Sequence, residues 1–155
     1  MSDEQSFELT LEQIDDYEFR VRFDGTSLAP LSTDEPPPLG HDAGPNPSRL
    51  LVAAVANCLS ASLLFSLRKF KNDPAKLTAH ARATLGRNAS GRWRIDRIAV
   101  ELNMASAAAS LQHLQRILAQ FEDFCVVTES VRQGIAVDVS VRDGTGALLH
   151  ASNLA

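Results

Sequence analysis

Two cysteines are the residues of this sequence with the clearest capacity for chemistry. Cys58 lies inside the most apolar segment, residues 44–65 (GPNPSRLLVAAVANCLSASLLF), and Cys125 follows the tetrapeptide FEDF. A thiolate is a nucleophile and a redox group, whereas a free cysteine in a core is a small hydrophobe. Their spacing does not show whether the two Cα atoms lie within the roughly 7 Å that a disulfide requires. Two interpretations stay open: a reactive thiol pair, or two inert core residues.

The sequence around Cys58 supplies no positive charge beside it. Asn46 is a good N-cap and Pro47 suits the first helical position, so a helix is predicted over residues 47–71. Cys58 is then about twelve residues from the N-cap, or roughly 18 Å along the axis. The helix dipole fades within the first turn, and Arg49 projects half a turn away. Any group that lowers the pKa of this thiol must come from elsewhere in the fold.

Small and apolar side chains share the helical face of Cys58 and leave room for a pocket beside its sulfur. On this face lie Leu51, Ala54, Val55, Ala61, Ser62 and Phe65. We expect substrate contacts from Leu51, Val55, Ser62 and Phe65. Ser48 in the first turn and His41 in the preceding loop complete the candidate binding residues.

The rest of the chain predicts a single α+β domain over residues 1–155. Apolar and polar residues alternate with the period of half-buried strands over residues 7–12, 17–23, 77–85, 93–104 and 135–141. Helical spacing appears over residues 111–121, and Cys125 falls where that helix should end. The proline-rich stretch 31–46 predicts a stiff loop without regular structure, and His150 is expected in a tail.

The predicted central helix is apolar on nearly every face, so it either crosses a membrane or is buried on all sides. Asn57, Ser60, Ser62 and Ser66 interrupt it, which favours burial. A chain of 155 residues does not easily cover such a helix. Oligomerisation is therefore expected.

Charge and composition exclude several classes of protein. The net charge is −4 with interspersed signs, which gives no footprint for nucleic acid. The acidic start MSDEQSFELTLEQ lacks the features of a secretory signal, so we expect a cytoplasmic protein with reduced thiols. Two cysteines cannot form a four-thiolate zinc site, and no histidine pair has metal-binding spacing. We expect neither a metal ion nor a cofactor.

Two segments resemble the OsmC/Ohr family, the osmotically induced and organic hydroperoxide resistance proteins. GPNPSRLLVAAVANC is similar to the family motif in which a turn opens a long buried helix that carries the peroxidatic cysteine. FCVVTESVRQGIAVDVSV resembles the block in which the resolving cysteine begins a short helix before the final strand. The resemblance extends from the N-terminal strands through Val141.

The resemblance implies an OsmC-like fold in an intertwined homodimer, with strands of both subunits wrapped around two central helices. It also implies a thiol peroxidase that reduces organic hydroperoxides. In such an enzyme the Cys58 thiolate becomes a sulfenic acid and condenses with Cys125 to a disulfide. Family members are re-reduced by small dithiols or lipoylated proteins.

The chain departs from the family at positions that bear on catalysis. Ser48 stands where many members have a glutamate that orients a catalytic arginine, and Val126 replaces a common proline. In one branch of the family that arginine lies shortly before the Asn-Pro turn, where this chain offers only His41. In another branch it lies in the first hairpin, where Arg20 or Arg22 could serve. Alternation places both arginines on a polar strand face, so a purely solvated role also fits them. The alternative function is a non-catalytic dimer that binds a small apolar ligand.

Overall fold

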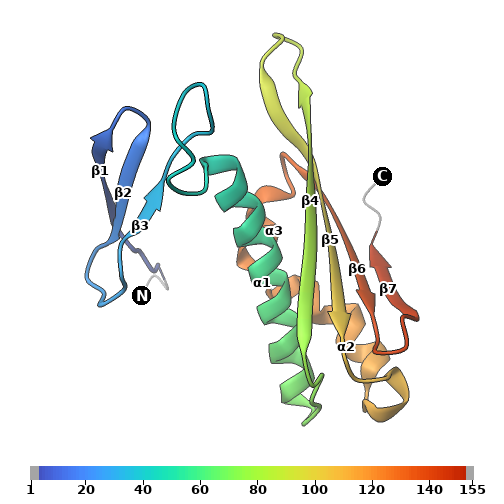
Figure 1. Cartoon of the computed structure of the whole chain (residues 1–155). Helices are drawn as coiled ribbons and strands as arrows, with labels where there is room; N and C mark the ends of the chain where they lie inside the picture. Colours follow the sequence, from blue (N-terminus) through green and yellow to red (C-terminus); the bar gives the residue numbers. More distant parts are fainter. Residues whose placement is uncertain (1–3, 153–155) are drawn as a thin grey trace. The chain divides into compact units, whose positions relative to one another are not determined.

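The computed structural model of this protein describes residues 4–152. The chain divides into two compact units, one up to Leu50 and one from Leu51 onward. The first contains a three-stranded sheet, and the second contains a four-stranded sheet with helices (Figure 1). This mixture is the predicted α+β class. That the two units make a single domain remains a prediction.

The first unit is a small antiparallel sheet in the order β1-β2-β3. The alternating residues predicted as strands form β1 (Leu9–Asp15) and β2 (Glu18–Phe23). The prediction of an irregular stretch over residues 31–46 is wrong at its start. Leu31–Thr33 forms β3, because these residues precede the prolines and pair with residues 19–21 of β2.

The proline-rich loop after β3 is ordered by one buried carboxylate. Asp34 accepts hydrogen bonds from the backbone N–H groups of Glu35 at 2.8 Å, His41 at 2.9 Å and Ala43 at 3.1 Å. The bonds from His41 and Ala43 do most to hold the pKa of Asp34 below its usual value. The loop that leads into the central helix is therefore stiff, as its prolines predict.

The central helix α1 (Pro47–Lys69) begins where the sequence predicts and ends slightly before Lys71. Asn46 caps it, because its side-chain oxygen accepts the N–H of Arg49 at 3.0 Å. Every fourth residue is fully buried in the core of the second unit: Val55, Leu59, Leu63 and Leu67. Ala54, Asn57, Ala61 and Phe65 are exposed. A single chain therefore buries one side of α1 and leaves the side of Ala54, Asn57, Ala61 and Phe65 exposed, which we call the open side of α1.

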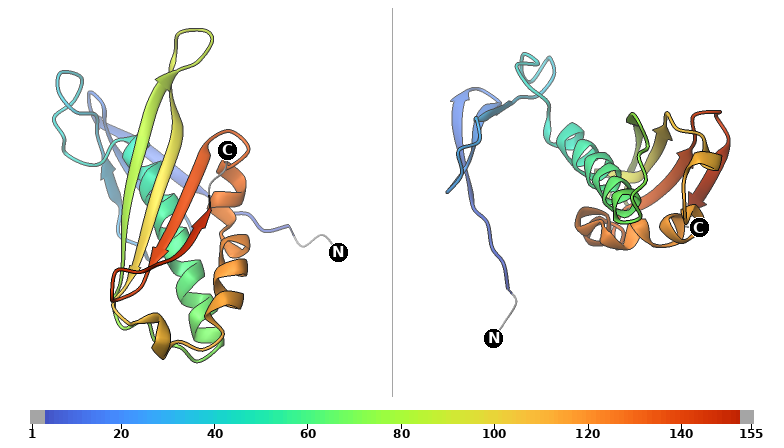
Figure 2. Two further views of the ribbon diagram at one scale, coloured as in Figure 1. Left: turned by 90° about the vertical axis from the view of Figure 1, so that its right-hand side faces the viewer. Right: turned by 90° about the horizontal axis from the view of Figure 1, so that it is seen from below.

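By length and composition α1 is long and apolar enough to cross a membrane. Its buried side chains pack instead against a sheet of order β4-β5-β6-β7. The strands are β4 (Leu77–Arg87), β5 (Trp93–Met104), β6 (Ala136–Arg142) and β7 (Leu148–Ser152). Figure 2 shows α1 lying across one face of this sheet. It is the core helix of an α+β unit.

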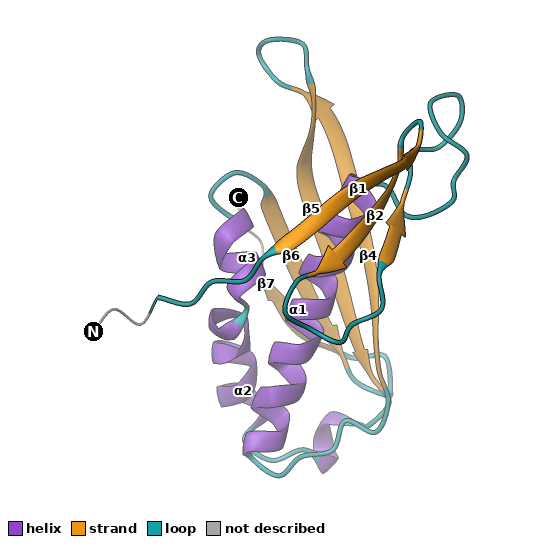
Figure 3. Ribbon diagram, turned by 90° about the vertical axis from the view of Figure 1, so that its left-hand side faces the viewer, coloured by secondary structure: helices purple, strands orange, loops and turns teal. Residues whose placement is uncertain are grey.

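The strand β5 confirms its predicted register, because Ile98, Val100, Leu102 and Met104 all point into the core. It pairs with β4 antiparallel and with β6 parallel. A parallel pair requires a crossover, and the helical segments between β5 and β6 supply it on the same face as α1 (Figure 3).

The crossover differs from the continuous helix predicted over residues 111–121. It contains short 3₁₀ turns, η1 (Ala108–Ser110) and η2 (Phe121–Phe124), and two α-helices, α2 (Leu114–Gln120) and α3 (Val126–Val131). Cys125 lies at the junction of η2 and α3, as expected. The prediction of a C-terminal tail at His150 is wrong, because this residue lies in β7 and pairs with Val141 of β6.

Candidate functional site

Cys58 lies at the edge of an apolar hollow on the open side of α1. The thiol is half-buried, and the hollow has a volume of about 360 Å³. Its lining, which we call the thiol hollow, consists of Cys58, Ala61, Ser62, Phe65 and Phe124. The rings of Phe65 and Phe124 meet edge to face, with centroids 5.9 Å apart. A ligand in this hollow would meet one sulfur atom and mostly hydrocarbon.

Cys125 is fully buried and caps the N-terminus of α3. Its sulfur accepts the backbone N–H of Thr128 at 3.4 Å and lies 2.8 Å from the Thr128 hydroxyl oxygen. The sulfur thus takes the place that an oxygen occupies in an ordinary N-cap, where residue N3 donates its N–H. This arrangement fixes the direction of the thiol.

The fold brings the two cysteines together, although 66 residues separate them in the sequence. Burial raises the pKa of the Cys125 thiol, and the neighbouring Cys58 thiol raises it further through a side-chain hydrogen bond and its charge. The contacts from Thr128 act in the opposite direction. Both cysteines are free thiols. The site therefore pairs a partly accessible thiol with a buried, protonated one.

The candidate binding residues fall into three groups. Ser62 and Phe65 line the thiol hollow with Cys58. Val55 is fully buried in the core, and Leu51 is half-buried outside the hollow's lining. Ser48 and His41 belong to the first unit, where Ser48 is half-buried and His41 is exposed.

Both candidate arginines project from β2 of the first unit and are exposed. Arg22 forms an exposed ion pair with Glu12 of β1 at 3.4 Å. Among the described residues, Arg20 forms no ion pair. The polar strand face predicted for both residues is confirmed, and a role for either beside Cys58 stays a prediction.

Sequence reasoning missed two residues of the site. Phe124 lines the thiol hollow beside Phe65, and Thr128 holds the Cys125 sulfur. The spacing Cys-x-x-Thr was the available signal for Thr128, because an N-cap side chain reaches the backbone of the third residue after it. Phe124 had no signal beyond being adjacent to Cys125.

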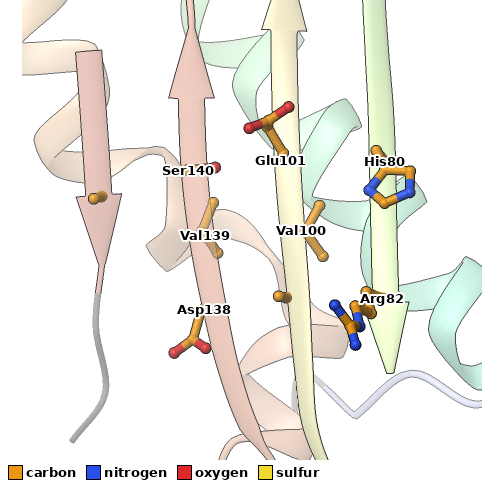
Figure 4. Close-up of a pocket in the computed structure, with 9 residues that line it drawn as sticks. His80, Arg82, Val100, Glu101, Asp138, Val139 and Ser140 are labelled. Carbon is orange, nitrogen blue, oxygen red and sulfur yellow. The ribbon is translucent and has the colours of Figure 1, made fainter. Parts of the chain in front are cut away.

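A second hollow lies on the opposite face of the four-stranded sheet, with a volume of about 280 Å³ (Figure 4). Its carboxylates are already committed to ion pairs: Glu101 with Arg142 at 3.1 Å, and Asp138 with Arg97. The Arg142 side chain is also the main reason that the pKa of Glu101 lies below its usual value. The lining contains no thiol. The cysteine pair is therefore the better candidate for chemistry.

The family model described as OsmC-like protein matches residues 40–140. This range covers well over half of the chain and includes both cysteines. No curated protein matches the sequence.

Solved structures of low sequence identity share the fold. An organic hydroperoxide resistance protein from Elizabethkingia anophelis, with thiocyanate bound, is 19% identical with a TM-score of 0.71, over 92% of this chain and 99% of that one. A putative organic hydroperoxide resistance protein from Vibrio cholerae has captopril in one of its active sites. It is 20% identical with a TM-score of 0.70, over 96% and 99% of the two chains. A hypothetical protein from Aquifex aeolicus is 15% identical with a TM-score of 0.72, over 90% and 97%.

Proposed function

This chain belongs to the OsmC-like protein family, and on that premise we propose that it is a thiol-dependent peroxidase that reduces organic hydroperoxides. The observation that carries the proposal is the pairing of thiols: Cys58 faces an apolar hollow, and the Cys125 thiol lies beside it. Two proteins of similar structure are described as organic hydroperoxide resistance proteins, one of them as putative.

The first step takes place in the thiol hollow. The Cys58 thiolate attacks the terminal oxygen of the hydroperoxide, the O–O bond breaks, and the alkoxide leaves as an alcohol after taking up a proton. Cys58 is left as a sulfenic acid. The hydrocarbon part of the substrate packs against Phe65, Phe124 and Ala61, which line the hollow.

The second step uses Cys125. Its sulfur attacks the sulfenic sulfur of Cys58, an S–S bond forms, and the sulfenic oxygen leaves as water with the proton of the Cys125 thiol. Burial and the raised pKa keep Cys125 protonated until Cys58 is oxidised, so it does not compete for peroxide. A small dithiol or a lipoylated protein then reduces the disulfide, and this reductant is part of the proposal.

The proposed assembly is a homodimer with strands of both subunits in each sheet. The open side of α1 supports it, because Ala54, Asn57, Ala61 and Phe65 stay exposed to solvent in the single chain. Phe7, Leu9 and Leu11 also leave apolar surface exposed in the first unit. Covering such surface contributes about 25 cal/mol per Å². We expect the dimer to persist below micromolar concentration in sedimentation, and a stable monomer there would contradict the assembly.

We also propose that Arg20 or Arg22 activates Cys58 and that the protein works in the cytoplasm, where thiols stay reduced. A non-catalytic dimer that binds a small apolar ligand is the second candidate function. Ser48 favours this alternative, because it offers no carboxylate to orient an arginine. The retained pair of neighbouring thiols favours the enzyme.

Replacing each cysteine separately tests the two steps. Cys58→Ser should abolish consumption of cumene hydroperoxide, because the nucleophile is lost. Cys125→Ser should allow one turnover and leave a sulfenic acid on Cys58 that dimedone traps and that excess peroxide over-oxidises. Peroxide consumption by Cys58→Ser at the wild-type rate would overturn the proposal.

A further inference from the structure

A largely buried cluster of polar and charged side chains lies around the segment that carries Cys125. The Glu122 carboxylate pairs with the Arg132 guanidinium, lies 2.6 Å from His150 Nε2 and accepts the Ser152 hydroxyl at 3.3 Å. The side chain of Glu122 is 11% exposed, and those of Arg132 and His150 are 20% exposed. We call Glu122, Arg132, His150 and Ser152 the Glu122 cluster.

The members of this cluster come from three separate elements. Glu122 belongs to η2, just before Cys125, and Arg132 caps the C-terminus of α3, just after it. His150 and Ser152 lie on β7, at the edge of the sheet. Glu122 therefore ties the two ends of the Cys125 segment to each other and ties the whole segment to the sheet.

At the junction itself the Cys125 side chain is buried and held by Thr128, whereas the flanking backbone lies at the surface. The two chain neighbours of Cys125 are exposed, Phe124 by 50% and Val126 by 75%. The Cys125 N–H donates to the carbonyl of Glu122 at 3.0 Å, so a shift of Glu122 is transmitted directly to the Cys125 backbone. The ring of Phe121 packs edge-on against His150, with centroids 5.4 Å apart, which strengthens the same link to β7.

We propose that Glu122, Arg132 and His150 are positioning residues that hold Cys125 beside Cys58 and so determine how readily the two thiols join. The inference deepens the proposed function and rests on it only for the peroxide-driven reaction. The step it controls is condensation of the Cys58 sulfenic acid with the Cys125 thiol, which forms the S–S bond and releases water.

The physical basis is effective concentration. Two groups held in the correct geometry react far faster, and join more favourably, than groups that must first find each other. Removing the Glu122 charge leaves the largely buried Arg132 guanidinium without its closest carboxylate, which destabilises the present arrangement of the 122–132 segment. The 122–132 segment then samples positions in which Cys125 lies away from α1.

The test compares Glu122→Gln with Glu129→Gln. Glu129 is a matched control, because it pairs with the same Arg132 at 3.6 Å but is 57% exposed. The Cys58–Cys125 disulfide is equilibrated with glutathione redox buffers, and its fraction is measured by mass after alkylation. We expect Glu122→Gln to shift the equilibrium at least about tenfold toward the dithiol, with Glu129→Gln within about twofold of wild type. An equal equilibrium in all three proteins would overturn the proposal.

A second readout separates positioning from general damage. After one equivalent of cumene hydroperoxide, Glu122→Gln should consume peroxide at the wild-type rate but show far more dimedone-trapped Cys58.

If Glu122→Gln fails to fold, a pair of His150 variants serves instead. The amide of His150→Gln can still donate to Glu122, whereas His150→Ala has no donor. His150→Ala should shift the glutathione equilibrium toward the dithiol, whereas His150→Gln should keep it near the wild-type value. Equal equilibria in these two would contradict the proposal.

The glutathione measurement stands without any peroxidase activity. If peroxide leaves the wild-type thiols intact, the proposed function fails. A shift in the Glu122→Gln equilibrium would still support positioning in that case, so the two failures are distinguishable.

Discussion

Thr128 holds the Cys125 sulfur with two groups, its backbone N–H at 3.4 Å and its hydroxyl oxygen at 2.8 Å. The thiol therefore serves as the N-cap of α3 in the reduced protein. A disulfide draws the Cys125 sulfur from hydrogen-bond distance to bonding distance of the Cys58 sulfur, which pulls it from the Thr128 N–H and weakens this cap. Oxidation is thus expected to loosen the first turn of α3, which joins the redox state of the cysteines to the structure of a short surface helix.

Replacing Thr128 tests its effect on the Cys125 thiol. The Thr128 hydroxyl stabilises the Cys125 thiolate. Thr128→Val keeps the side-chain volume but removes this hydroxyl, so the pKa of Cys125 should rise further above its usual value. The measurement is thiolate absorbance against pH in a Cys58→Ser background, where Cys125 titrates alone. Ser130→Ala is the control, because the Ser130 hydroxyl bonds only to the Val126 carbonyl. An unchanged titration would show that the hydroxyl does not act on the thiol.

Alanine replacements of Arg20 and Arg22 test whether either guanidinium activates the Cys58 thiol. In a Cys125→Ser background, replacing the responsible arginine with alanine should slow the oxidation of Cys58 by cumene hydroperoxide at neutral pH, because the thiolate loses its positive partner. Arg22 is already paired with Glu12 at the surface, so Arg20 is expected to have the larger effect. If neither variant slows the oxidation of Cys58, both arginines are solvated strand residues.

The thiol hollow should select bulky oxidants. Each methylene group that it buries contributes about 0.8 kcal/mol, so cumene hydroperoxide should react at least about tenfold faster than hydrogen peroxide. Ala61→Trp fills the hollow and should remove this preference while leaving the hydrogen peroxide rate largely intact. Ala119→Trp, at an exposed position of α2, is the control. Equal second-order rates for the two oxidants in the wild type would contradict this role for the hollow.

Asp143 gives the protein a pH-dependent contribution to stability. The Thr145 hydroxyl and the Ala108 N–H are the main causes that lower its pKa to about 2. A carboxyl group with a lowered pKa in the folded state stabilises above the unfolded value of about 3.9, and this contribution is lost as pH falls toward 2. In the wild type the urea concentration at the unfolding midpoint should fall between pH 5 and pH 2, and Asp143→Asn should make this fall smaller. Asp123→Asn, at an exposed position, should follow the wild type.

The sequence predicted the elements that have strong periodicity. Strand β5 and helix α1 are long and bury one regular row of side chains each, so their patterns are visible without the fold. Strands β3 and β7 were missed because they are short and owe their conformation to pairing with β2 and β6. Helix α2 begins later than its leucine spacing indicates, after His113 in a left-handed conformation.

The site was predictable only in part. The apolar helix and its motif identified Cys58, and a junction was expected at Cys125. Their proximity depends on the crossover between β5 and β6, which no local pattern encodes. The Glu122 cluster could not be predicted either. Glu122 and His150 are 28 positions apart in the sequence, and His150 lies in a strand that the sequence did not predict.

The central claim is that Cys58 and Cys125 form a peroxide-driven redox pair. The most direct measurement is the intact mass and free-thiol count of the wild-type protein before and after one equivalent of cumene hydroperoxide. We predict rapid loss of both thiols and a mass decrease of two hydrogen atoms, as a Cys58–Cys125 disulfide requires. Two free thiols and an unchanged mass would contradict the peroxidase and favour a protein that only binds an apolar ligand.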